Sequence, residues 1–164
     1  MNSMKCRLCM EIENKCEHIV FEQYCNLVLN KQNIIKEYKY FVLVSDIIPI
    51  TLGHILIVPK KHFLSCAFMN SEYINELHMI ITELRRFLKE NHRLNCEFFE
   101  HGMGCDFNCG GSCISHAHVH TLPTNKSIYS YVKEKTNFKE INMKWFLQNK
   151  NQLTPNGYTL FIDI

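Results

Sequence analysis

The segment 71–92, SEYINELHMIITELRRFLKENH, constrains the fold of this chain more than any other. Its apolar residues recur every three or four positions, as in a helix that buries one face against a partner layer. They are Ile74, Leu77, Ile81, Leu84 and Leu88. Ser71 is the predicted N-cap, and Lys89 and Arg93 suit the negative end of the helix dipole. A long helix of this kind needs a sheet or further helices to cover its apolar stripe.

Strand-like segments lie on both sides of this helix. Their β-branched and aromatic residues are bounded by turn residues such as Pro49 and Gly53, which is typical of strands joined by short connections. The segments are residues 19–30, 38–46, 54–60, 96–100, 114–123, 138–148 and 157–164, while residues 126–135 are predicted to form a short helix. Because strands outnumber helices, the sequence predicts an α+β fold in which one main helix packs on an antiparallel sheet.

Length and charge limit the organisation and the partners of the chain. A length of 164 residues favours one domain, residues 1–164, and 46% hydrophobic with 21% charged residues is typical of a globular protein. A formal net charge of +2 gives no indication of a nucleic-acid surface. No apolar run reaches the ~18 residues of a membrane span, and the first residues do not resemble a secretory signal. We therefore expect a cytoplasmic protein that binds neither nucleic acid nor membrane.

Residues 116–120, HAHVH, place three histidines at alternate positions. In a strand the three rings share one face, about 7 Å from one to the next, while the residues between them point toward a core. Three imidazoles are costly to bury unless each ring nitrogen has a partner. The pattern therefore indicates metal ligation or nucleophilic and acid–base catalysis, and the residues alone leave both open.

Nine cysteines are many for a chain in which no export signal is visible. Their odd number and a reducing location favour metal ligation over a disulfide framework. Cys6 and Cys9 form a C-x2-C pair, which supplies half of a tetrahedral zinc shell, and two histidines would complete it. The candidate histidines are His62 and those of residues 116–120.

Three further cysteines, Cys105, Cys109 and Cys113, are spaced by four residues in a Gly-rich loop. One interpretation is a second metal or iron–sulfur site, since thiolates on such a loop can converge on one ion. The simpler interpretation is a loop that faces the substrate, because this spacing matches no common ligand pattern.

Two stretches of the sequence resemble the histidine-triad (HIT) family of nucleotide hydrolases and transferases. One is SDIIPITLGHILIVPKKH, residues 45–62, with an aspartate, a proline-containing turn, Gly-His, an apolar strand and Pro-Lys-Lys-His. The other is GGSCISHAHVHTLP, residues 110–123, with His-X-His-X-His ahead of a proline. The resemblance implies the family fold, an antiparallel sheet of about five strands with a helix packed on it, and pairing as a homodimer.

The resemblance also implies roles for single residues. His118 would attack the α-phosphorus of a nucleotide and form a covalent nucleotidyl-histidine, and His120 would help to bind the phosphate. Asp46 resembles the family acid that binds the ribose hydroxyls, with Ile47 and Ile48 beside the base. The expected activity is that of a nucleotide phosphohydrolase that releases a nucleoside monophosphate.

A structural zinc ion is implied by the same resemblance. Some members bind zinc through a C-x2-C pair, a histidine after the second motif strand and the first histidine of the triad. Carried onto this chain, the zinc ligands are Cys6, Cys9, His62 and His116. The ion would tether the N-terminal segment, residues 1–18, to the catalytic strand. Residues 124–164 form a C-terminal extension that carries little of the resemblance.

The chain departs from the family pattern near the expected phosphate site. Glu100, assigned to the nucleotide site, stands in Glu-His-Gly where the family commonly has a stretch such as Asn-Glu-Gly. A glutamate there would repel a phosphate unless it is protonated or faces away. Cys113 replaces the usual Ser or Thr, so the hydroxyl that assists the leaving group would come from Ser112, the assigned residue, or from Ser115.

A second departure concerns a positive charge. Thr124 stands where an arginine often follows the proline of the histidine strand, so a cation that anchors the phosphate is missing or comes from elsewhere. The candidates are Lys60, Lys61 and Lys126. Two alternatives to hydrolysis therefore stay open: a nucleotidyltransferase to a sugar phosphate or other small acceptor, and a zinc-stabilised nucleotide-binding module without turnover. Glu100 and Thr124 favour the latter.

Overall fold

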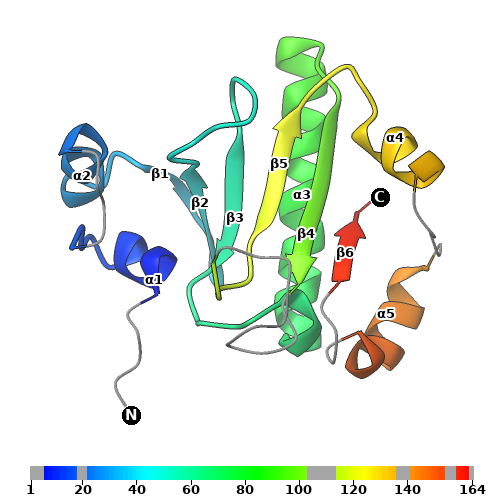
Figure 1. Cartoon of the computed structure of the whole chain (residues 1–164). Coiled ribbons are helices and arrows are strands. Elements are labelled where there is room, and N and C mark those ends of the chain that lie inside the picture. Colours follow the sequence, from blue (N-terminus) through cyan, green and yellow to red (C-terminus); the bar gives the residue numbers. More distant parts are fainter. Residues whose placement is uncertain (1–5, 18–21, 103–113, 136–140, 154–157, 163–164) are drawn as a thin grey trace.

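A computed structural model of the chain describes residues 6–17, 22–102, 114–135, 141–153 and 158–162. Its centre is a six-stranded sheet in the order β1-β2-β3-β5-β4-β6, in which all neighbouring strands are antiparallel, with helix α3 lying along one face (Figure 1). The strands are β1 (Ile34–Glu37), β2 (Phe41–Ser45), β3 (Ile55–Pro59), β4 (Cys96–Gly102), β5 (Val119–Pro123) and β6 (Tyr158–Phe161). The helices are α1 (Arg7–Ile12), α2 (Glu22–Leu29), α3 (Ser71–His92), α4 (Ile128–Lys135) and α5 (Met143–Asn149), with 3-10 turns η1 (Cys66–Phe68) and η2 (Lys150–Gln152). The predicted α+β class is confirmed, with six strands rather than five.

Helix α3 spans the residues that the sequence predicts. Its apolar stripe is buried against the sheet, because residues three and four apart lie on one side of a helix. The cap differs from the prediction by one position: the side chain of Asn70, not Ser71, accepts a hydrogen bond from the amide of Tyr73 at 3.2 Å. Asn70 has the extended backbone of a cap, whereas Ser71 already belongs to the helix.

The sheet has two faces with different surroundings. The helix face packs on α3 through a large core that includes Phe41, Ile57, Phe98 and Val119. We call the opposite side the front face, where Leu8 of α1 packs on a smaller cluster. That cluster consists of Val42, Val44, Leu56 and Val58.

The register of the strands shows which residues share the front face with the histidines. Val44 lies opposite Leu56, Leu56 opposite His120, and His120 opposite Phe99. Residues opposite each other in an antiparallel pair point to the same face. His120 and Phe99 therefore share the front face with the cluster that α1 covers.

Two predicted strands are helices in the structure. Residues 19–30 contain α2, whose buried Tyr24 and Val28 are four residues apart on one helical face. Residues 138–148 contain the start of α5, which Asn142 caps by accepting a hydrogen bond from the amide of Trp145 at 2.8 Å. Both segments are rich in β-branched and aromatic residues, and tertiary packing overrode that weak preference. The helix predicted at 126–135 and the strand predicted at 157–164 are confirmed as α4 and β6.

Two cysteines form a covalent link that the sequence analysis did not expect. A disulfide joins Cys16, after α1, to Cys25 in α2. The described residues also contain four free cysteines, which are Cys6, Cys9, Cys66 and Cys96. Among the helices of the described ranges, none has the length and apolar character needed to cross a membrane.

The C-terminal strand β6 attaches to the edge of β4 (Figure 1). Gly102 lies opposite Tyr158, and a Cβ at Gly102 would overlap the tyrosine ring. The Tyr158 hydroxyl donates to Glu100 at 2.7 Å and accepts from the amide of Ala67 at 3.1 Å. Glu100 also accepts from the amide of Cys66 at 2.7 Å. β4 and β6 together therefore hold η1, the turn that follows the predicted zinc ligand His62.

Candidate functional site

The histidine segment is only partly a strand. Strand β5 begins at Val119, so His116 and His118 precede it and His120 lies within it. The amide of Ala117 donates to the carbonyl of Phe63 at 2.6 Å, which holds the segment before the strand begins. The predicted alternation is nevertheless present, because Ala117 and Val119 pack in the core of the helix face. The prediction of a strand over all of 114–123 was too long at its start.

Backbone carbonyls fix the protons of His116 and His118. The Nε2 atom of His116 lies 2.9 Å from the carbonyl oxygen of Pro59, and Nδ1 of His118 lies 2.7 Å from the carbonyl oxygen of His116. A carbonyl only accepts, so each of these nitrogens carries the hydrogen. In the neutral rings the lone pairs are therefore at Nδ1 of His116 and Nε2 of His118.

A fourth histidine, His54, orients His120, and the sequence analysis assigned it no role. Nδ1 of His54 accepts from the amide of Ile50 at 3.2 Å, so the hydrogen of its neutral ring is on Nε2. That nitrogen lies 2.9 Å from Nδ1 of His120 and donates to it. His120 consequently carries its own hydrogen on Nε2. The signal for His54 was a polar residue at the head of an apolar strand, but its partner depends on the pairing of β3 with β5.

The surroundings keep these rings neutral. Burial lowers the pKa of His116 to about 4, with the carbonyl of Pro59 opposing the shift. Burial also lowers the pKa of His120 to about 3, aided by the neighbouring His118 and His54. The pKa of His118 is lowered mainly by burial, and the positive charge of Arg7 contributes in the same direction. At neutral pH the lone pair on Nε2 of His118 is thus available for chemistry.

The rings of His118 and His120 lie next to each other on the front face. Their centroids are 4.8 Å apart, and Phe99 stacks on His120 with a centroid distance of 4.6 Å. The aromatic face holds the His120 ring in plane, while His54 holds it by a hydrogen bond. The pair thus presents a nucleophilic nitrogen and an N–H donor side by side, which suits attack on a group with negative oxygens.

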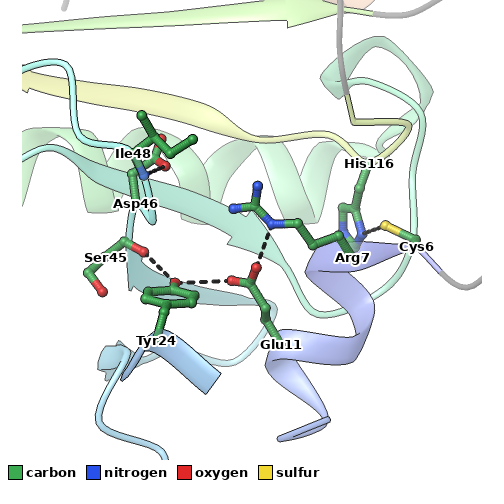
Figure 2. Close-up of polar contacts among 8 residues, drawn as sticks. All are labelled: Cys6, Arg7, Glu11, Tyr24, Ser45, Asp46, Ile48 and His116. Carbon is green, nitrogen blue, oxygen red and sulfur yellow. Dashed lines mark hydrogen bonds and ion pairs between the residues drawn. The ribbon is translucent and has the colours of Figure 1, made fainter. Parts of the chain in front are cut away.

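The four predicted zinc ligands come together. One ligand atom from each of Cys6, Cys9, His62 and His116 lies within 4.8 Å of all the others. Sγ of Cys9 is 3.3 Å from Nδ1 of both His62 and His116, and Sγ of Cys6 is 3.5 Å from Nδ1 of His116 (Figure 2). Two sulfurs and two imidazole nitrogens at such distances match the donor set of a tetrahedral zinc site.

The residues predicted to bind the nucleoside lie at the end of β2. Oδ1 of Asp46 accepts from the amide of Ile48 at 2.9 Å (Figure 2). Its Oδ2 lies 3.4 Å from Nδ1 of His54. The Ile48 side chain is 68% exposed, and Ile47 is half-buried. Asp46 is therefore next to the ring that orients His120, with apolar side chains beside it.

Glu100 does not join this group. It is fully buried on the side of β4 opposite to Phe99, where it binds Cys66 and Tyr158. Burial raises the pKa of its carboxyl group, with those hydrogen bonds opposing the shift. The strand alternation that puts Phe99 on His120 turns Glu100 away from it, so its assignment to the nucleotide site is corrected. Ser112, Cys105, Cys109 and Cys113 lie outside the described residues.

The lysines proposed to replace the missing arginine lie elsewhere. Lys60 pairs with Glu37 at 3.0 Å, and Lys61 lies over the ring of Phe63. Lys126 lines a cavity of about 530 Å³ at the far end of β4 and β5, beside Arg85 and Lys89. Thr124 hydrogen-bonds there to Lys126. None of the described contacts brings these three lysines to His118.

The HIT domain family model matches residues 28–127, which include both motif stretches, His54 and the three histidines of residues 116–120. The chain belongs to the HIT domain family. Adenosine 5'-monophosphoramidase HINT3 of Mus musculus is 34% identical over 82 residues, which are 49% of this chain and 47% of that protein. This HIT protein thus spans about half the length of that relative.

Solved structures share the fold. A hypothetical protein from Leishmania major superposes with a TM-score of 0.57 at 13% identity, covering 90% of this chain and 92% of that one. A zinc-bound histidine triad family protein from Mycobacterium smegmatis superposes with a TM-score of 0.52 at 16% identity, covering 91% and 92%. At these identities the similarity shows the HIT fold of the chain and no more.

Proposed function

We propose that this HIT protein is a nucleotide phosphohydrolase that releases a nucleoside monophosphate through a covalent bond to His118. The observation that carries the proposal is the proton arrangement: the carbonyl of His116 holds the Nδ1 hydrogen of His118, so its Nε2 has the free lone pair. A neutral imidazole of fixed tautomer is a nucleophile at pH 7. Adenosine 5'-phosphoramidates are the substrate class that we assign, because a relative is named an adenosine 5'-monophosphoramidase.

The proposed reaction has two steps. Nε2 of His118 attacks the α-phosphorus, so that an N–P bond forms while the bond to the amine breaks, and the departing amine takes up a proton from solvent. Water then attacks the same phosphorus, the N–P bond breaks, and the nucleoside monophosphate leaves as the water gives up its proton to solvent. Nε2–H of His120 donates to the phosphoryl oxygens in both steps, which stabilises their developing charge.

The nucleoside would extend toward the end of β2. The Asp46 side chain is 14% exposed, so its carboxylate can accept hydrogen bonds from the two ribose hydroxyls. Ile47 and Ile48 would flank the base with apolar surface, which Ile48 presents to solvent in this structure.

Structural zinc is the cofactor that we propose for Cys6, Cys9, His62 and His116. The donor atoms fit, because the Nε2 hydrogen of His116 is already engaged by a carbonyl and its Nδ1 lone pair faces the two sulfurs. When bound, zinc supplies a rigid link between α1 and the residue whose carbonyl sets the tautomer of His118. The chain's own residues carry every step of the reaction.

The test is intact-protein mass spectrometry after rapid mixing of zinc-loaded protein with adenosine 5'-phosphoramidate. We expect a transient gain equal to one AMP group that is absent in His118→Ala. His78→Ala, an exposed histidine of α3, is the matched control and should keep the adduct. An adduct that persists in His118→Ala, or none in the wild type, contradicts the proposal. Products formed with an added sugar phosphate separate hydrolysis from nucleotidyl transfer.

Besides the roles proposed above and the expected absence of nucleic-acid and membrane partners, further expectations of the sequence analysis remain predictions. They are the single domain over 1–164, the homodimer and the cytoplasmic location. Sedimentation equilibrium of the full chain tests the homodimer, and a mass near twice 19.4 kDa is the expected result.

A further inference from the structure

A buried carboxylate in α1 is used by no step of the proposed reaction. The Glu11 side chain is 1% exposed and makes two side-chain contacts (Figure 2). Nε of Arg7 donates to its Oε1 at 2.6 Å, and the hydroxyl of Tyr24 lies 3.2 Å from its Oε2. The same hydroxyl lies 2.9 Å from the carbonyl oxygen of Ser45, the residue before Asp46. A buried charge is retained only with partners, so this network ties α1 and α2 to the end of β2.

The network leaves most of the Arg7 guanidinium available. Its contact with Glu11 uses Nε, and the described residues give the two terminal nitrogens no hydrogen-bond partner. In Figure 2 these nitrogens point away from Glu11, and in that view the guanidinium lies between His116 and Asp46. The Arg7 side chain is 29% exposed, so a ligand can reach it. Four N–H donors in a planar fork remain for an anion.

The neighbours of Arg7 in α1 and before it lie close to the histidine segment. Cys6, the neighbour of Arg7, has its sulfur 3.5 Å from His116. Leu8 belongs to the same buried cluster as Leu56, which lies opposite His120. Among the cations considered above, Arg7 is thus the one whose surroundings include the triad.

We propose that Arg7 binds the phosphoryl group of the substrate beside His118, and that Glu11 and Tyr24 position its guanidinium for that contact. The inference rests on the proposed nucleotide site. It names Arg7 as the cation in place of the arginine that this chain lacks at Thr124. Arg7 would touch the substrate, whereas Glu11 acts through Arg7. Because Glu11 neutralises part of the charge, directional N–H donors rather than long-range attraction would recognise the phosphate.

Equilibrium binding of adenosine and of AMP to the zinc-loaded full chain tests the inference without turnover. We expect Arg7→Met to weaken AMP binding by about 10- to 100-fold, the loss of a charge-assisted contact, and to change adenosine binding by less than about twofold. Arg7→Lys should recover part of the AMP preference, since it keeps a charge without the fork. Glu11→Gln should weaken AMP binding by a smaller factor, because Arg7 remains but loses its anchor.

Zinc content is measured in every variant, because Arg7 lies between two proposed ligands. Lys15→Met is the matched control, a lysine of the same segment that pairs with Glu13 and should leave both affinities unchanged. Arg7→Met that keeps the wild-type ratio of AMP to adenosine affinity overturns the inference, as does a wild type with no preference for AMP. The adduct assay is independent of this ratio: a wild type that prefers AMP through Arg7 yet forms no adduct would refute the proposed catalysis and leave the Arg7 contact standing.

Discussion

The two ends of the described chain lie outside the HIT match and contact the protein in different ways. The N-terminal part, residues 6–17, lies on the front face and brings two sulfurs to His62 and His116. The C-terminal part, residues 141–153 and 158–162, pairs with β4 and packs into the core of the helix face. One end therefore adds chemical groups to the site, and the other adds support behind it.

The C-terminal part is connected to the histidine segment through the loop that contains His62, Phe63 and η1. Tyr158 and Glu100 hold η1, which follows His62 and Phe63. Phe63 in turn accepts from the amide of Ala117, between two histidines. Damage at the N-terminal end should therefore appear in turnover, whereas damage at the C-terminal end should appear first in stability.

The largest expected effect follows from loss of the proposed zinc ion. Removal of zinc by a chelator, or Cys9→Ser, should lower turnover by about 100-fold, because His116 loses its anchor and its carbonyl sets the tautomer of His118. Zinc content by mass spectrometry and steady-state rates check this. Cys96→Ala, a cysteine of β4 outside the group, is the control. Full activity in zinc-free protein would show that the N-terminal sulfurs do not contribute to turnover.

Gly102→Ala tests the C-terminal end next. The added Cβ would overlap the ring of Tyr158, so we expect a loss of about 2 kcal/mol in the free energy of unfolding. Urea denaturation measures it, and kcat of the folded protein should change little. In a Tyr158→Ala background the extra cost of Gly102→Ala should vanish. If the two effects simply add, the assigned clash is wrong.

Tyr158→Phe removes a single hydroxyl from the support. The change leaves an oxygen of Glu100 and the amide of Ala67 without this partner, so we expect a loss of about 1.5 kcal/mol. Turnover should fall by less than about tenfold, since the metal group is untouched. Thermal denaturation and rates on the same sample separate the two. A loss of turnover above about tenfold with little loss of stability would show that Tyr158 acts on the site, as the N-terminal groups are expected to do.

The smallest effect is expected at the cap of α5. Asn142→Ala removes the side chain that accepts from the amide of Trp145, at an exposed helix end, and should cost about 0.5 to 1 kcal/mol. Denaturant titration measures the change, with Asn142→Ser as the variant that keeps a cap. Turnover at saturating substrate should be unchanged, and any loss would show that α5 is coupled to the site.

The sequence predictions succeeded where the structure depends on residues close together in the sequence, and failed where it depends on tertiary packing. Helix 71–92 was predicted correctly apart from its N-cap, which differs by one residue, because its apolar stripe is a local pattern. Residues 19–30 were assigned the wrong structure, because Tyr24 and Val28 suit a strand in composition and a helix in spacing. Only the packing of α2 distinguishes the two.

By itself the sequence determined the fold class, the grouping of apolar residues and, through two motifs, which residue types could serve as nucleophile and ligands. Those features depend on period and spacing along the chain. Tertiary structure alone decided that His54 bonds to His120, that Glu100 turns away from it, and that Tyr24 joins the Arg7–Glu11 pair to the end of β2. Each depends on strand register and on the placing of α1 over the sheet, because partners far apart in sequence meet only after the sheet has formed.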